Sequence, residues 1–260
     1  MEKHTAVITG ASGGIGYELA RQFAIHGYDL VLVARSVDTL KLIADDFQTR
    51  YRNTVHIAPF NLARPDAPGE LYYHLDRNEI TVDVLVNNAG FGIHGLFYEN
   101  DLPETMELVQ VNVAAVTQLT GLFLKGIVER NRGGILNVAS TSAFQPGPYM
   151  AAYHASKAYI LSLTEGIASE LAGTNVKISV LCPGPTDTGF QARAQNTGSI
   201  LGNRTVLMMP AEKVARIAYK EFMEGKRIIL PGLLNKLGAI SAPRAPRSWV
   251  LPIVKFLHHK

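Results

Sequence analysis

The stretch T-A-V-I-T-G-A-S-G-G-I-G, residues 5 to 16, joins a short apolar run to a turn that contains four glycines. The apolar run predicts a buried β-strand, and the residues after the turn predict a helix. In the turn, Gly10 permits a sharp reversal, Gly14 lets the backbone approach an anion, and Gly16 lets the helix pack against the strand. Backbone N–H groups at the helix start would then face a pyrophosphate. The open alternative is a tight strand-to-helix connection that binds nothing.

Strand and helix patterns alternate along the rest of the chain. Continuous apolar runs indicate strands buried on both faces, which is typical of a parallel sheet with helices above and below it. We therefore predict an α/β fold with a doubly wound, seven-stranded parallel sheet, whose ligands bind beyond the carboxyl ends of the strands. The predicted strands are 5–9, 30–34, 54–59, 82–86, 134–139, 176–181 and 227–230. The predicted helices are 14–26, 37–50, 67–79, 103–130, 149–172 and 210–224.

The composition is that of one globular domain. Hydrophobic residues make up 47% and charged residues 18% of the 260 residues, which argues against disorder. The single cysteine, Cys182, excludes a disulfide within the chain and fits a reducing compartment, so we expect a cytoplasmic protein. We expect no signal peptide, because the first strand begins at Thr5, and no apolar run reaches the ~18 residues of a membrane span.

The carboxyl-terminal segment differs from the rest in charge. Residues 232 to 260 contain five basic residues and no acidic one, whereas the rest carries two more acidic than basic residues. A nucleic-acid footprint over the body of the protein is therefore not expected. Two apolar stretches, 233–240 and 249–257, are separated by prolines that would break a continuous helix. We predict that they cover a pocket or form a subunit contact; the alternative, suggested by Trp249 and Phe256, is an interfacial segment on an anionic membrane.

The end of the second predicted strand bears on the choice of cofactor. Sites for NAD usually place an acidic residue there to hold the ribose hydroxyls, whereas an arginine suits the 2′-phosphate of NADP. Here the residues are Ala34, Arg35 and Ser36. The alternative is a solvated arginine at a helix start, but the absence of an acid favours NADP.

Further motifs follow the glycine turn in a fixed order: N-N-A-G at 87–90, Asn112, Ser140, Y-x-x-x-K at 153–157 and P-G at 183–184. Together they resemble the short-chain dehydrogenase/reductase family over at least residues 5 to 190. The resemblance implies a Rossmann-like fold, with a catalytic and NADP-binding domain over 1–232 and an extension packed on it over 233–260. It also implies a catalytic tetrad. The tetrad is Asn112, Ser140, Tyr153 and Lys157.

The same resemblance implies a set of cofactor contacts. Asn61 and Leu62 stand where the family usually has an aspartate and an apolar residue beside adenine, and an amide can still bond adenine. Thr186 and Thr188 would meet the nicotinamide carboxamide, and Tyr153 and Lys157 would hold its ribose. The implied contacts are Thr9, Gly10, Ser12, Gly14, Ile15, Gly16, Arg35, Asn61, Leu62, Asn88, Ala89, Gly90, Tyr153, Lys157, Pro183, Gly184, Thr186 and Thr188.

The four tetrad residue types suit carbonyl chemistry. Reducing a carbonyl requires a general acid beside the oxygen, and a tyrosine with an ordinary pKa of about 10 needs a nearby cation to lower it. Lys157 lies one helical turn after Tyr153, so we predict that it lowers the pKa of Tyr153. Ser140 can donate to the substrate oxygen. Asn112 is an awkward residue inside a helix unless its amide has a task, such as anchoring a water beside Lys157.

These observations predict an NADP(H)-dependent oxidoreductase that interconverts a carbonyl compound, which is a ketone or an aldehyde, and the corresponding alcohol. The alternative is a catalytically silent sensor or interaction module that binds NADP. The segments 91–97, 141–149 and 191–209 are candidate pocket walls, and their apolar content favours an apolar substrate. The histidines show no metal-ligand pattern, and His94 and His154 are interpreted as solvated. We expect a homodimer or homotetramer through the helices of 103–130 and 149–172.

Overall fold

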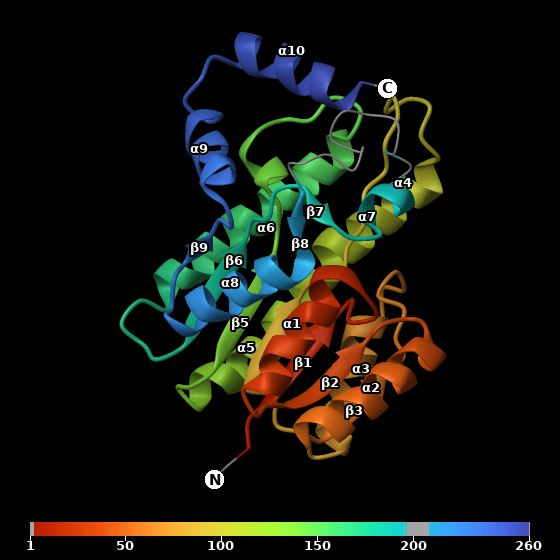
Figure 1. The fold of residues 1–260 in the computed structure, drawn as a ribbon, viewed down its shortest axis with the longest axis vertical. Coiled ribbons are helices and arrows are strands. Elements are labelled where there is room, and N and C mark those ends of the chain that lie inside the picture. Colours follow the sequence, from red (N-terminus) through yellow and green to blue (C-terminus); the bar gives the residue numbers. More distant parts are fainter. Residues whose placement is uncertain (1–2, 195, 197–207, 260) are drawn as a thin grey trace.

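Seven short runs of apolar and β-branched residues form one parallel sheet in the computed structural model, which describes residues 3–194, 196 and 208–259 (Figure 1). Neighbouring strands follow the order β3-β2-β1-β4-β5-β6-β9, and every pairing is parallel. The prediction of a seven-stranded parallel sheet is therefore confirmed. The strands are β1 Thr5–Thr9, β2 Asp29–Val33, β3 Val55–Ala58, β4 Val84–Asn87, β5 Gly134–Val138, β6 Lys177–Leu181 and β9 Ile228–Ile229.

Helices cover both faces of the sheet because the strands bury alternate side chains on opposite sides. In β1, Ala6 and Ile8 pack in one cluster with α1 (Gly14–Ile25), α2 (Val37–Tyr51) and α8 (Ala211–Met223). Val7 packs in a second cluster on the opposite face. Such burial on both faces is what continuous apolar strands require. The helices of that face are α3 (Ala67–Arg77), α5 (Val116–Glu129) and α6 (Ala151–Glu170).

The order of the strands reverses beside β1, since β2 lies on one side of it and β4 on the other. At such a switch point the connections leave on opposite faces and open a crevice beyond the carboxyl ends of the strands. The glycine turn follows β1 and the N-N-A-G motif follows β4. Both motifs therefore lie at this crevice.

The predicted helix over 103–130 is interrupted. It consists of α4 (Leu102–Val109), one π-helical segment η1 (Gln110–Ala115) and α5. By length and composition alone, this helix of 28 residues could cross a membrane, and it is the one such helix in the described part of the chain. However, 44% of its most apolar 18-residue window is buried inside the protein. Leu108, Leu119 and Phe123 on it are buried in the protein. We therefore describe it as a core helix.

The carboxyl-terminal segment forms two helices, α9 (Leu233–Ser241) and α10 (Arg247–His258), at the end of the molecule where the strands end (Figure 1). Pro243 and Pro246 lie between them, as the predicted break requires. The short helix α7 (Phe190–Arg193) and a two-residue strand pair, β7 (Thr186–Asp187) with β8 (Met209–Pro210), were not predicted.

Candidate active site

The glycine turn has the backbone geometry that its sequence predicted. Gly10 and Gly14 have positive φ angles of 67° and 54°, which side chains with a Cβ rarely adopt. A Cβ at Gly16 would collide with the carbonyl oxygen of Gly10, so the start of α1 can approach β1 only with glycine there. Backbone N–H groups at the start of α1 thus face the crevice, as an anion site requires.

Thr9 supports the loop after β4 instead of lining the cavity. Its buried hydroxyl donates to the carbonyl of Val86 (3.2 Å) and accepts from the N–H groups of Asn88 (2.9 Å) and Ala89 (3.0 Å). The Asn88 amide donates to the Thr9 carbonyl (3.0 Å). Thr9 and Gly16, two of the predicted cofactor contacts, therefore lie behind the wall of the cavity and hold it in shape.

A cavity of about 830 Å³ runs from the glycine turn to the carboxyl-terminal helices α9 and α10. The predicted cofactor residues on its wall are Gly10, Ser12, Gly14, Ile15, Arg35, Asn61, Leu62, Asn88, Ala89, Gly90, Tyr153, Lys157, Pro183, Gly184, Thr186 and Thr188. Arg35 is exposed at the end of β2. The wall thus offers a phosphate cradle at one end and a cation beside it, which fits a dinucleotide that carries an extra phosphate.

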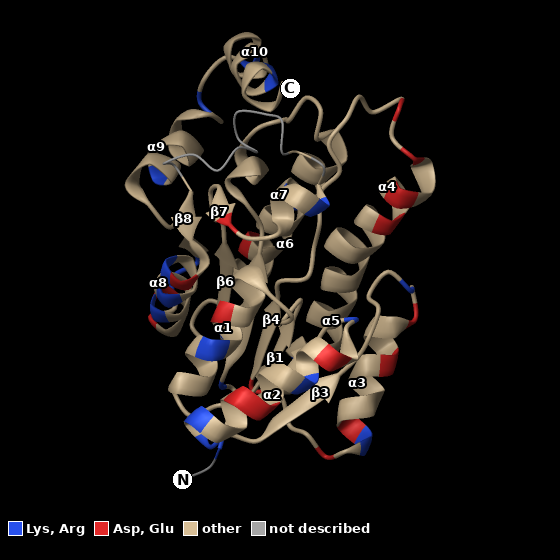
Figure 2. Cartoon of the chain, turned by 45° about the vertical axis from the view of Figure 1, so that its right-hand side comes forward, with Lys and Arg blue, Asp and Glu red and all other residues tan. Residues whose placement is uncertain are grey.

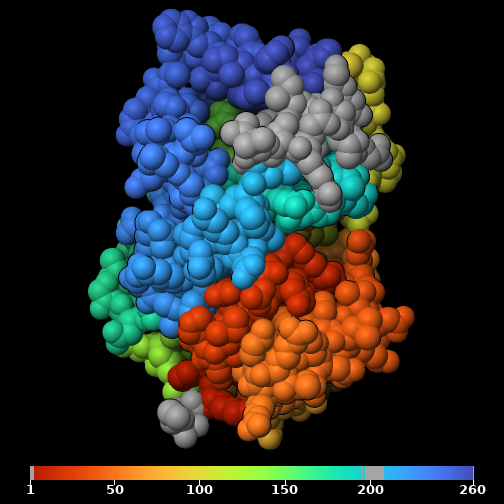
Figure 3. Space-filling model, viewed as in Figure 1, coloured from red at the N-terminus to blue at the C-terminus, as the bar shows by residue number. Residues whose placement is uncertain are grey.

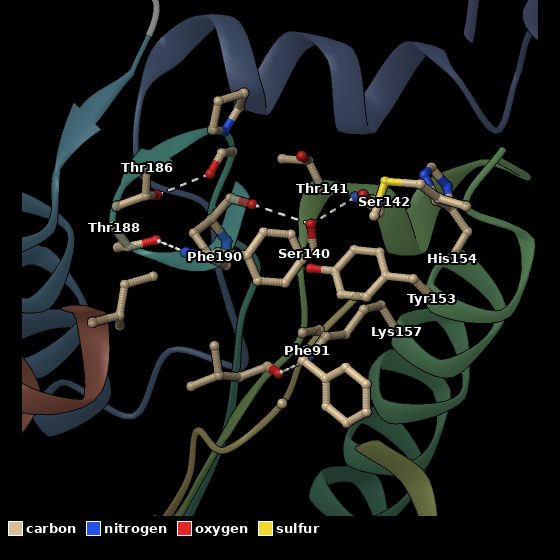
Figure 4. Close-up of a pocket in the computed structure, with 18 of the residues that line it drawn as sticks. Phe91, Ser140, Thr141, Ser142, Tyr153, His154, Lys157, Thr186, Thr188 and Phe190 are labelled. Atoms are coloured by element: carbon tan, nitrogen blue, oxygen red, sulfur yellow. Dashed lines mark hydrogen bonds between the residues drawn. The ribbon is translucent and has the colours of Figure 1, made fainter. Parts of the chain in front are cut away.

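Three tetrad residues meet in the middle of this cavity. Tyr153 and Lys157 lie one turn apart on α6, and Ser140 follows β5 (Figure 4). The Tyr153 hydroxyl points toward Ser140 (Figure 4). The Ser140 Oγ also accepts from the Ser142 N–H (3.1 Å), which fixes its orientation. A carbonyl oxygen placed between the two hydroxyls could accept from both.

The protonation of Tyr153 differs from the prediction. Burial raises the pKa of Tyr153 to about 12, although the nearby Ser140 hydroxyl acts in the opposite direction. Lys157 does not lower this pKa here, because its Nζ donates to the Val138 carbonyl (2.8 Å) and lies 5.7 Å from the centre of the Tyr153 ring. Burial lowers the pKa of Lys157 to about 8. Tyr153 is therefore a neutral phenol at neutral pH.

Asn112 lies in the π-helical segment η1, fully buried. Its Oδ1 accepts from the Phe91 N–H (3.1 Å), and its Nδ2 donates to the Phe91 carbonyl (2.9 Å) and to the Ser156 Oγ (3.1 Å). The side-chain amide of Asn112 is thus bonded to the chain itself through both its oxygen and its nitrogen. Asn112 ties the helix to the loop after β4 and does not line the cavity.

Gly90 lets the Asn112 amide approach that loop. A Cβ at Gly90 would lie 3.0 Å from the Asn112 Oδ1 and 3.4 Å from the Lys157 Nζ. The first spacing is tighter than an ordinary van der Waals contact, and the second is at the lower limit of one. The glycine of the N-N-A-G motif therefore leaves room mainly for the Asn112 amide.

The predicted substrate walls are partly wrong. Phe91 lines the cavity, but Phe144 packs against the core and Tyr149 against His94. Met208 and Met209 do not line it, and Met209 packs against the sheet. Residues 197–207, which include Arg204 and Leu207, lie outside the described part of the chain. Sequence reasoning missed the cavity residues Met150, His154, Phe190 and His258, whereas Val250 and Val254 belong to the stretch 249–257 that was predicted to cover a pocket.

His154 is not solvated, contrary to the prediction. Its side chain is 2% exposed, and its Nδ1 donates to the Gln145 carbonyl (2.8 Å). Burial lowers its pKa. His94 is half-buried, and its Nε2 donates to the backbone carbonyl of His258 (2.7 Å) on α10. Within the described residues, no group of three His, Cys, Asp or Glu side chains is arranged to hold a metal ion.

The parallel sheet, with a glycine turn after β1 and a cavity beyond the ends of its strands, is a Rossmann-like α/β fold. The sequence profile described as "short chain dehydrogenase" matches residues 4–198, and the chain belongs to this family. The chain is 33% identical to a mouse protein named 17-beta-hydroxysteroid dehydrogenase type 3, over 68% of this chain and 58% of that protein. It is 34% identical to the ketoacyl reductase HetN of a Nostoc species, over 69% of this chain and 62% of that protein.

A solved structure extends the comparison to most of the fold. A short-chain dehydrogenase from Sphingobium yanoikuyae, in complex with NADPH, superposes with a TM-score of 0.83 at 29% sequence identity. The superposition covers 93% of each chain. The chain spans only about three fifths of the length of the two curated relatives named above, so their activities bear on it only as proposals.

Proposed function

We propose that the protein is an NADP(H)-dependent oxidoreductase that interconverts an apolar ketone or aldehyde and its alcohol. The observation that carries the proposal is the meeting of Ser140 and Tyr153 in one cavity whose other end is a phosphate cradle. Bound NADPH would supply the hydride. The exposed Arg35, at the end of a strand that carries no acid there, supports NADPH over NADH.

The residues of the chain have separable tasks in this reaction. Tyr153 gives its hydroxyl proton to the substrate oxygen, and its raised pKa keeps that proton in place at neutral pH. Ser140 donates to the same oxygen as negative charge develops on it. Lys157, whose Nζ lies 5.7 Å from the centre of the Tyr153 ring and whose pKa burial lowers to about 8, can supply a proton to replace the one that Tyr153 gives up.

Apolar walls support an apolar substrate. Phe91, Met150 and Phe190 border the cavity near Tyr153, and Val250 and Val254 border it from α10. The names of the two curated relatives, a hydroxysteroid dehydrogenase and a ketoacyl reductase, support a ketone on a large apolar skeleton. They differ from each other in substrate, so the proposal extends to the class and no further.

The test is the initial rate of NADPH oxidation with a panel of ketones and aldehydes that differ in size and polarity. We expect turnover with bulky apolar ketones, and a preference for NADPH over NADH at matched salt. Pure protein that binds NADPH but turns over no member of the panel would contradict the proposal and favour a nucleotide-binding sensor.

A further inference from the structure

Helix α10 has two apolar faces, of which one is buried against the cavity and the other is largely exposed. Val250, Val254 and His258, spaced by four residues, are buried toward the cavity. Trp249 and Phe256 are 68% and 67% exposed, and Ile253 between them completes a stripe at the spacing of a second helical face. Covering the cavity therefore leaves this second stripe in solvent.

Helix α9 repeats the arrangement. Its Leu233 and Leu237 are 73% and 56% exposed, and with the exposed Ile240 they form a stripe with the same spacing of four and then three residues. The buried apolar side chain of α9 is the small Ala239. In both helices the buried side chains are small or of medium size, and the large apolar side chains are exposed. A helix that only packs on a protein core would bury its large apolar side chains instead.

The charges around these stripes are all positive. Lys236, Arg244, Arg247 and Lys255 are exposed, and no acidic residue follows Glu224 in the sequence. None of the described acidic side chains forms an ion pair with these four cations. Figure 2 shows α9 and α10 with basic residues only, whereas α4 carries acidic ones. In the space-filling view both helices form the outer surface at that end of the molecule (Figure 3).

We propose that the outer stripes of α9 and α10 are a docking surface for an anionic lipid bilayer. Aromatic and aliphatic side chains beside uncompensated cations are the composition of an interfacial helix, in which the apolar side chains enter the boundary of the acyl chains. At 12 residues α10 is about 18 Å long, too short to cross a hydrocarbon core of about 30 Å, so it would lie in the surface.

A second copy of the chain is a poorer occupant. A two-fold contact would place the same surface on both sides, and the four cations of one copy would then face those of the other. Like charges brought together across an interface oppose association. A lipid surface with negative headgroups supplies the missing opposite charge without that conflict.

Docking would also bring the mouth of the cavity to the bilayer. Leu234 and Ile253 are exposed and at the same time border the cavity. An apolar carbonyl compound dissolved in the acyl chains would then reach Tyr153 without crossing water. This consequence rests on the proposed function, whereas the docking itself does not.

Trp249 makes the docking directly measurable, because it is the only tryptophan of the chain. The full-length protein is titrated with vesicles of phosphatidylcholine and phosphatidylglycerol in equal amounts, and separately with vesicles of phosphatidylcholine alone. We expect a blue shift of tryptophan emission and co-sedimentation with the anionic vesicles only. Both should be lost when salt rises from about 0.05 M to about 0.5 M, as screening of charged surfaces requires.

Two sets of matched variants separate local from overall charge. The first changes Lys236, Arg244, Arg247 and Lys255 to Gln, and the control changes Lys41, Lys213, Arg216 and Lys220 to Gln, so both sets have the same net charge. Each cation near an anionic surface contributes roughly five-fold to partition, so the first set, which lacks four cations, should bind roughly 600-fold more weakly. The control should bind like the wild type.

A further variant, Leu237→Ser with Phe256→Ser, tests the apolar stripes while Trp249 remains as the reporter. It should reduce partition at least tenfold at low salt, with an unchanged melting temperature. Equal binding to both vesicle types, or equal loss in the two glutamine sets, would overturn the proposal. If tryptophan emission shifts to the blue as the protein concentration rises without vesicles, the surface instead binds a second copy of the chain.

Discussion

Arg35 is the residue that we expect to bind the 2′-phosphate of NADPH, because it lines the cavity after β2 and the glycine turn contains no basic residue. Replacing Arg35 by Asp should therefore weaken NADPH binding by about 1.5 to 3 kcal/mol, the range of a hydrogen bond to a charged group. NADH binding should change little or improve, because an acid can hold the ribose hydroxyls. Titration of cofactor fluorescence at fixed salt measures both affinities.

Arg216→Asp, at an exposed position of α8 away from the cavity, is the matched control for overall charge. It should leave the ratio of NADPH to NADH affinity unchanged. A wild-type protein that prefers NADH, or an equal loss in both variants, would show that Arg35 does not select the cofactor.

Tyr153 carries the proton in the proposed reaction, so Tyr153→Phe removes the one hydroxyl that serves as the acid. We expect turnover to fall by about 10² to 10⁴, the usual contribution of a general acid, with NADPH affinity nearly unchanged. Tyr159→Phe on the same helix is the control, because Tyr159 is half exposed and its hydroxyl contacts Thr117 outside the cavity. Wild-type rates in Tyr153→Phe would contradict the mechanism.

At the scale of elements, the local sequence pattern was enough to predict the strands and helices of the sheet core. The strands and helices of the sheet core follow from apolar runs and amphipathic stretches, and the predicted boundaries agree with the observed ones to within a few residues. Asn112 shows the limit. Its awkwardness in a helix was visible in the sequence, but the π-helical segment and the bonds to the Phe91 backbone depend on a loop 21 residues away.

The carboxyl-terminal helices show a second limit. The spacing of Val250, Val254 and His258 could have revealed an inward face of α10, yet nothing in it names the cavity as the partner. The same holds for His154, whose burial results from contacts with Gln145 and with α10. The burial of His154 depends on which distant elements meet and was therefore missed, whereas the prediction that 233–240 and 249–257 cover a pocket agrees with the cavity that α9 and α10 border.

Helix α10 should loosen in acid because His258 is buried beside other histidines. Burial lowers the pKa of His258 to about 4, and the nearby His154 and His94 act in the same direction. As pH falls from about 6.5 toward 4, the unfolded chain binds a proton that the folded chain does not, so the free energy of unfolding decreases. Between pH 7 and pH 5 the loss is about 2 kcal/mol.

His258→Met isolates this effect, since the backbone carbonyl that accepts from His94 remains. Denaturant unfolding of the two proteins at pH 7 and pH 5 gives four free energies. The wild type should lose more stability than the variant over this interval, by about the same 2 kcal/mol. Parallel losses in both proteins would mean that another group governs the acid response.

For the whole molecule, the expected dimer or tetramer must use exposed positions of the helices over 103–130 and 149–172. Leu108, Val116, Leu119 and Leu161 on these helices are buried within the chain, so they cannot supply a subunit contact. The exposed apolar residues on the same helices are Leu102, Met106, Val109 and Tyr159. Light scattering should give a mass of two or four chains, and Met106→Glu should lower it. A mass near one chain for the wild type at micromolar concentration would contradict the expectation of an oligomer.

The carboxyl-terminal segment borders the cavity with both α9 and α10, and shortening it in two steps tests its role as a cover. Asn235 on α9 packs against Gly184 in the predicted cofactor loop, so cutting after Gly232 should weaken NADPH binding as well as turnover. Cutting after Pro246 removes only α10 and leaves that contact. This shorter cut should keep NADPH affinity but lower kcat/KM for bulky apolar ketones.

The size of the second effect follows from the apolar wall that α10 supplies. Losing about 60 Å² of contact with a bound substrate corresponds to about 1.5 kcal/mol, or roughly a tenfold fall in kcat/KM. A small ketone that does not reach α10 should react at nearly the wild-type rate, which serves as the control. Because the cut also bares the cavity, Val250→Ala with Val254→Ala provides a soluble variant that should show the same selectivity in milder form. If the kinetics with bulky ketones were unchanged in both variants, α10 would not contribute to substrate binding, and only its outer surface would have a function.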